Sequence, residues 1–222
     1  MENLTQTATT NPQQSLGVKD EPKMRLARAI SVVLHPFFVP LYMVLTLLYT
    51  RTIFWYYTTP VKLYLIGATI LFTMLLPFVV LNVLKRVGVL TSLSVTNRKE
   101  RIMPLLAGAA CYMLCSVMLM RSPSLFLLGK MMAGAACCEL FVLMVTLRWK
   151  ISLHLTAMGG AMGMLVMMSV AGAGGFTAPI ILCTALCGVL ATSRLYLGCH
   201  NGWQILAGFS SGFLIMVLSM LF

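Results

Sequence analysis

The sequence predicts an all-α fold, a polytopic transmembrane helix bundle of about six to seven spans. Hydrophobic residues make up 59% of the 222 residues, and charged residues only 9%. The mean hydropathy is +0.93. A water-soluble domain needs far more polar surface to cover its core, so this composition excludes a soluble globular enzyme. We expect membrane lipids as partners and no nucleic acid.

Long apolar runs give the expected spans in order. Each approaches the roughly 20 residues that cross a ~30 Å hydrocarbon core, although the third and the sixth are short. Residues 1–28 form a polar tail without the short apolar core of a cleavable signal peptide, so 29–222 is expected to be one transmembrane domain. The seven runs are 30–49, 61–84, 104–120, 124–147, 153–171, 177–193 and 204–222.

Prolines and glycines indicate how these spans are shaped and joined. His35-Pro36 at the start of the first run, with Pro40 one turn later, predicts a kinked helix entrance rather than a catalytic group. Residues 58–60, 121–124 and 173–175 are typical of tight turns. Small residues inside the later runs predict close helix packing; they are Gly159, Gly160, Gly163, Gly208 and Gly212.

Lysines and arginines are distributed unevenly between the two sides of the predicted bundle. Twelve of the 16 fall on the side of the N-terminal tail, whereas Arg51, Lys62 and Arg121 fall on the other and Lys130 lies inside the fourth span. This bias places the basic side in the cytoplasm, and we expect a protein of the bacterial inner membrane. A phosphate site would also gather basic residues on its own side, whichever compartment that side faces.

Three basic or histidine-bearing segments share that side, at 97–104, 150–154 and 193–204. Pro104 fits the first turn of a helix, which places Arg101 at a helix mouth. Ser152 could cap the next helix, where free backbone N–H groups attract phosphate. Since two crossings separate each segment from the next, all three can converge on one phosphate site.

These segments carry a family resemblance. Ser193-Arg194, five residues and His200 resemble the third signature of the type 2 phosphatidic acid phosphatase superfamily, and Ser152-Leu153-His154 is similar to the second. The segment from Arg98 to Pro104 resembles the first signature in composition but not in spacing. The resemblance covers residues 97–215 and is most specific in the third signature.

The resemblance implies a phosphatase or phosphotransferase that acts on a phospholipid or polyprenyl phosphate without a metal or other cofactor. His200 would attack phosphorus and carry a phosphohistidine, and His154 would protonate the departing alcohol. Arg194 would neutralise the phosphoryl oxygens. The implied phosphate-binding residues are Arg101, Lys99, Ser152 and Ser193.

Two residues leave the function open. The family has Asp where this chain has Gln204, which can orient the histidine but carries no charge. Glu139 lies deep in the fourth span. It is either a functional ionisable group or a protonated acid that is hydrogen-bonded within the bundle. The alternatives are therefore a non-catalytic protein that binds lipid phosphate headgroups, or a small transporter that uses Glu139. The oligomeric state does not follow from the sequence.

Overall fold

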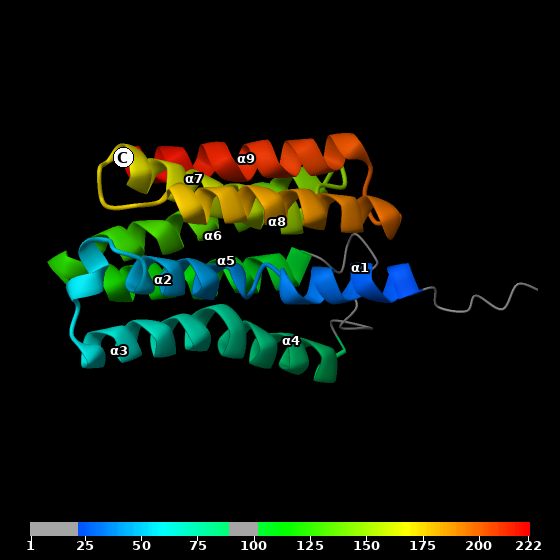
Figure 1. Cartoon of the computed structure of the whole chain (residues 1–222). Helices are drawn as coiled ribbons and strands as arrows, with labels where there is room; N and C mark the ends of the chain where they lie inside the picture. Colours follow the sequence, from blue (N-terminus) through cyan, green and yellow to red (C-terminus); the bar gives the residue numbers. More distant parts are fainter. Residues whose placement is uncertain (1–21, 89–101) are drawn as a thin grey trace, which may run out of the picture.

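The structure, a computed structural model, describes residues 22–88 and 102–222, and this part of the chain is a bundle of helices without a strand (Figure 1). It contains six helices that are long and apolar enough to cross a membrane, which confirms the predicted fold class. A continuous span, Thr59–Arg86, is built from α3 (Thr59–Ile70) and α4 (Leu76–Arg86). The other five spans contain α5 (Ile102–Met120), α6 (Phe126–Thr146), α7 (Leu153–Val170), α8 (Thr177–Tyr196) and α9 (Gly202–Leu221).

The first expected span is instead two helices, α1 (Pro22–Val33) and α2 (Val39–Tyr49). The predicted kink is a complete break, because Pro36 has no backbone N–H and Pro40 occupies the first turn of α2. The Tyr42 hydroxyl donates to Val33 O across the break at 2.9 Å, which satisfies a carbonyl at the end of α1. α1 also begins at Pro22, inside the expected polar tail of residues 1–28, and packs against α8.

A proline also shapes the second expected span. Between α3 and α4 the helix widens into a π-helical segment, Leu71–Leu75. Pro77 follows directly, and its ring would clash with the carbonyl four residues earlier in a regular α-helix. The wider turn accommodates the ring, so the span continues as one element.

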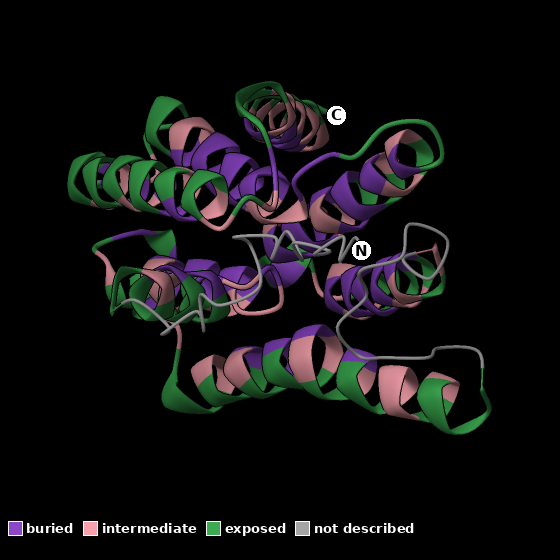
Figure 2. Ribbon diagram, turned by 90° about the vertical axis from the view of Figure 1, so that its right-hand side faces the viewer, coloured by how far each residue is buried: buried purple, intermediate pink, exposed green. Residues whose placement is uncertain are grey.

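α7 and α9 run parallel and in backbone contact, and α7 is the most enclosed of the spans. Buried residues lie on the helix faces that point into the bundle (Figure 2). A Cβ on Gly163 would lie 2.7 Å from Phe213 O, and one on Gly208 would lie 2.7 Å from Ser152 O. Gly212 packs as closely on Thr156 O. The predicted packing role of these glycines is confirmed, since only glycine leaves room for the facing backbone.

The described basic residues gather at the two ends of the bundle as predicted (Figure 1). Lys85 and Arg86 lie in the last turn of α4 and Arg194 in the last turn of α8, at the end where α5, α7 and α9 begin. Lys130, near the opposite end, donates from Nζ to Met220 O at 2.9 Å and so satisfies a C-terminal carbonyl of α9.

Candidate functional site

The turn between α8 and α9 brings two of the predicted site residues together. The sixth span was expected to end at residue 193, but α8 continues to Tyr196 and α9 begins at Gly202, so Arg194 is helical. The backbone reverses through Gly198 at φ 63°. Gly198 N donates to Leu195 O at 2.9 Å and Cys199 N to Arg194 O at 3.2 Å, which is a Schellman motif. The motif ends α8 and directs the chain into α9 with His200 between them.

Gln204 orients the buried His200. Gln204 Oε1 accepts a hydrogen bond from Asn201 N at 3.2 Å, and because a backbone N–H only donates, this atom acts as an acceptor. The same oxygen lies 3.2 Å from His200 Nδ1, so Nδ1 donates to it. The neutral imidazole therefore carries its lone pair on Nε2, as a histidine nucleophile requires.

His154, in the first turn of α7, is held by the backbone of α1. Its Nε2 lies 3.1 Å from Ser31 O, and a carbonyl oxygen only accepts, so Nε2 carries the hydrogen. Nδ1 is thus the nitrogen that can exchange a proton. Arg194 and, more weakly, His200 act electrostatically on His154, so the three residues expected to be catalytic lie in one region of the bundle.

His35 joins this group, although the sequence indicated only a kink there. Its ring lies 5.3 Å from the His154 ring, nearly perpendicular to it at 82°. Phe37 N donates to His35 Nδ1 at 3.3 Å, which leaves the hydrogen of the neutral ring on Nε2. Burial, and then the charge of Arg194, lower the pKa of His35 below its usual 6.5. A histidine at a break inside an apolar run was the signal that could have predicted this position.

Ser152 stands at the N-cap of α7, but its side chain makes no capping hydrogen bond, so the predicted capping interaction is absent. Its hydroxyl is fully buried and has no hydrogen-bond partner among the described residues, and the same holds for the Nε atom of Arg194. Ser152 N donates to Gln204 O at 3.3 Å, which joins the N-terminal ends of α7 and α9. A buried, unpartnered hydroxyl at the N-terminus of α7 favours an anionic ligand.

The remaining predicted phosphate-binding residues fall in different places. The Ser193 hydroxyl donates to Val189 O of its own helix at 2.8 Å rather than to another residue of the site. Lys99 and Arg101 lie outside the described residues.

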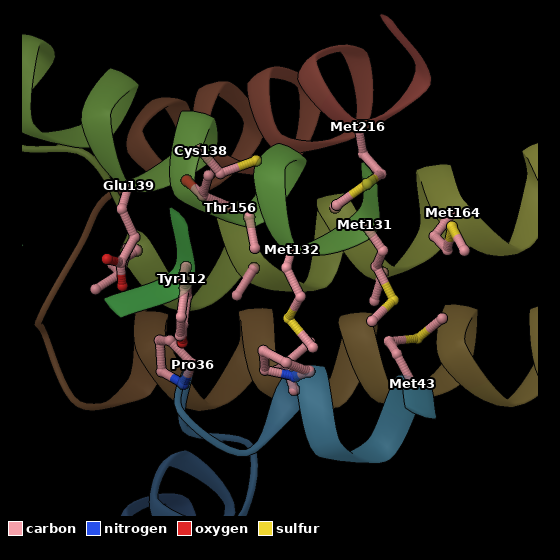
Figure 3. A pocket seen from close by; sticks show the side chains of 17 residues that line it. Pro36, Met43, Tyr112, Met131, Met132, Cys138, Glu139, Thr156, Met164 and Met216 are labelled. Atoms are coloured by element: carbon pink, nitrogen blue, oxygen red, sulfur yellow. The ribbon is translucent and has the colours of Figure 1, made fainter. Parts of the chain in front are cut away.

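Glu139 lies in a separate place, at the wall of a small central cavity (Figure 3). The side chain is 4% exposed and packs against Gly108 of α5, and its Oε2 has no hydrogen-bond partner within the described ranges 22–88 and 102–222. The cavity, about 50 Å³, is also lined by Tyr112 and Thr156 and by several methionines. It has room for a water molecule that could hydrogen-bond the Glu139 carboxyl group.

The described part of the chain holds no group of three or more His, Cys, Asp or Glu side chains that could bind a metal ion. The cluster of His35, His154, Arg194 and His200 supplies three chemical groups. Arg194 is a fixed cation, His200 is an imidazole in the nucleophilic tautomer, and His154 is an imidazole with a free nitrogen for proton exchange. Comparison of the chain with protein-family models, curated proteins and solved structures finds no match.

Proposed function

We propose that this protein is an integral membrane phosphatase or phosphotransferase of the type 2 phosphatidic acid phosphatase kind, which acts on a lipid phosphate. The observation that carries the proposal is the placement of Arg194 and His200 within electrostatic range of His154 at one end of the bundle, with His200 held by Gln204 in the nucleophilic tautomer. His154 comes from α7, Arg194 from α8 and His200 from the turn before α9, and helix packing alone does not require these side chains to lie in one region.

The reaction needs two steps on this geometry. His154 Nδ1, which carries no hydrogen in the neutral ring, first takes the proton of the lipid phosphate monoanion. His200 Nε2 then attacks phosphorus while the bond from phosphorus to the lipid oxygen breaks, and His154 Nδ1 gives that proton to the lipid oxygen. Water then attacks the phosphohistidine, His154 takes a proton from the water, and the His200 nitrogen leaves with its lone pair restored. Arg194 neutralises the phosphoryl oxygens throughout, and the Ser152 hydroxyl, unpartnered among the described residues, supplies another donor.

The chemistry of Gln204 distinguishes the proposed catalysis from the alternative, in which the protein binds phosphate without turnover. The family's carboxylate both orients the histidine and stabilises its cation. Gln204 supplies the orientation through its hydrogen bond but not the charge. In the Ser-His-Asp triad of a serine protease, Asp→Asn lowers the rate about 10⁴-fold, largely because it selects the wrong tautomer. Since the tautomer is right here, the proposal favours a slow enzyme over a binding protein.

The test uses purified full-length protein in detergent or nanodiscs with a lipid phosphate and no added metal. We expect release of inorganic phosphate, loss of release in His200→Ala, and a ³²P-labelled phosphohistidine that is absent from that variant. Binding of the lipid phosphate without turnover, unchanged in His200→Ala, would favour the non-catalytic alternative.

A second measurement isolates the role of His154. If His154 protonates the leaving group, His154→Ala should lower kcat by roughly 10²-fold or more for an alkyl phosphate. The loss should be far smaller for p-nitrophenyl phosphate, whose leaving group departs without a proton. Equal losses on both substrates would show that His154 only supports the site. Ser31→Ala is the control, because His154 bonds to the backbone carbonyl and not to the Ser31 side chain.

A further inference from the structure

We infer that an apolar groove between α2 and α8 holds the hydrocarbon chain of the lipid whose phosphate occupies the histidine–arginine cluster. This inference rests on the proposed function and adds the chain-binding half of the substrate site. The groove has a volume of about 890 Å³. α2 and α8 form its walls, and Met158, Ala161 and Leu165 of α7 form its floor.

The chemistry of the groove suits a hydrocarbon. The hydroxyl groups of three lining residues are directed to nearby carbonyls: Tyr42 donates to Val33 O, Thr46 to Tyr42 O and Thr50 to Thr46 O. Because these donors are already satisfied, they do not favour a polar ligand. The groove also lies within the apolar span, where a headgroup would lose its hydration.

The groove leads to the cluster along each of its helices. Val33 and Leu34 line it and directly precede His35, and Met158 lies one turn beyond His154 on α7. On α8, Leu186 lines the groove about two turns before Arg194. A lipid with its phosphate at the histidine–arginine cluster can therefore place its chain in the groove.

The length of the groove favours a single hydrocarbon chain of the phosphate-bearing lipid as its occupant, rather than a whole bilayer lipid. The 11 residues of α2 extend for roughly 16 Å, about one leaflet of a ~30 Å hydrocarbon core. At its end near the cluster the groove is lined by Val33 and Leu34, which directly precede His35. A second chain, where the substrate has one, would stay in the surrounding bilayer.

Two neighbouring residues of α8 give a matched test. Leu182 lines the groove and is 60% exposed, whereas Ile181 is 65% exposed and does not line it. We expect Leu182→Trp to lower kcat/KM for hexadecyl phosphate in nanodiscs by about tenfold or more, because the indole fills the path of the chain. Turnover of p-nitrophenyl phosphate should be unchanged, and Ile181→Trp should change neither substrate. Equal effects of the two variants on hexadecyl phosphate, or equal losses on both substrates, would overturn the inference.

A binding measurement separates the groove from the chemistry. Hexadecyl phosphate with a diazirine on its chain should photolabel α2 and the groove-facing side of α8 in both the wild type and His200→Ala, and Leu182→Trp should reduce the labelling. Labelling spread evenly over the lipid-facing surface would overturn the groove even if phosphate is released. Focused labelling without phosphate release from any lipid would retain the groove and reject the proposed catalysis.

Discussion

Gln204 shows how one side chain can serve a helix and a reaction centre together. Its backbone N–H is capped by Asn201 Oδ1 at 2.9 Å, and its Oε1 accepts from Asn201 N, which completes a capping box at the start of α9. The same oxygen accepts from His200 Nδ1. The capping box holds the amide in place, and the amide in turn selects the tautomer of the histidine.

Substitution of Gln204 separates these two tasks. Gln204→Ala leaves Nδ1 of His200 without its acceptor, so kcat should fall by roughly 10²-fold. In Gln204→Glu a carboxylate accepts the same two hydrogen bonds and stabilises the imidazolium, so kcat should be retained or should rise. Phosphate release from a lipid phosphate measures both variants. A loss in Gln204→Glu as large as in Gln204→Ala would contradict the orienting role.

His35 shows what a residue can contribute when the chain breaks beside it. Pro36 ends the helical hydrogen bonding, and the break turns the His35 ring onto His154. Because its pKa is lowered, His35 stays neutral at pH 7 and adds no second cation beside Arg194. Pro36 therefore accounts both for the predicted kink and for the contact between His35 and His154.

Among the elements, the α7–α9 pair determines the geometry of the site. Both helices begin at the same end of the bundle, joined by the hydrogen bond from Ser152 N to Gln204 O. Glycines keep the two backbones in contact, so His154 on one helix and His200 before the other have a fixed spacing. A wider separation of these helices would move the proposed proton donor away from the nucleophile.

The glycine contact predicts a clear difference between two alanine substitutions. In Gly212→Ala the new Cβ overlaps Thr156 O, so the helices must shift at a cost of about 1–3 kcal/mol, and the melting temperature in detergent should fall. On α8, a methyl group added at Gly188 would meet no described atom within 4 Å, so Gly188→Ala should leave the melting temperature unchanged or raise it slightly. An equal loss of stability in both variants would argue against a special α7–α9 contact.

At the scale of the whole molecule, the bundle has one end rich in basic residues and one end poor in them. The candidate site lies at the basic end (Figure 1). Positive charge at this end fits both a cytoplasmic position and a site for anionic headgroups. We propose the cytoplasmic position, whereas the family resemblance allows the opposite one.

Cysteine labelling decides the orientation. In a variant with Cys137 and Cys199 replaced by alanine, Leu147→Cys reports the basic end and Ser124→Cys the other, since both residues are exposed. A membrane-impermeant maleimide added to spheroplasts should label Ser124→Cys at once and Leu147→Cys only after permeabilisation. The reverse pattern would place the site outside the cytoplasm.

The sequence predicted more of the fold than of the candidate site. Apolar runs of about 20 residues, separated by turns that contain Pro and Gly, predicted the six long helices. A segment that crosses the hydrocarbon core must have a minimum length and must form its backbone hydrogen bonds internally. α8 ends three residues later than the apolar run predicted, because the helix continues past the charged Arg194 to the Schellman motif at Gly198. In the site, the spacing of Arg194 and His200 predicted that both belong to one site.

The sequence by itself determined that this is a helical membrane protein, with its basic and histidine-bearing segments on one side, because composition and the alternation of crossings are properties of the chain alone. Only the tertiary structure decided that His35 contacts His154, that Ser31 O and Gln204 select the two tautomers, and that the Ser152 hydroxyl does not cap α7. These depend on which faces of α1, α7 and α9 meet. Hydropathy does not encode that choice in lipid, where backbone contact between glycines decides the packing.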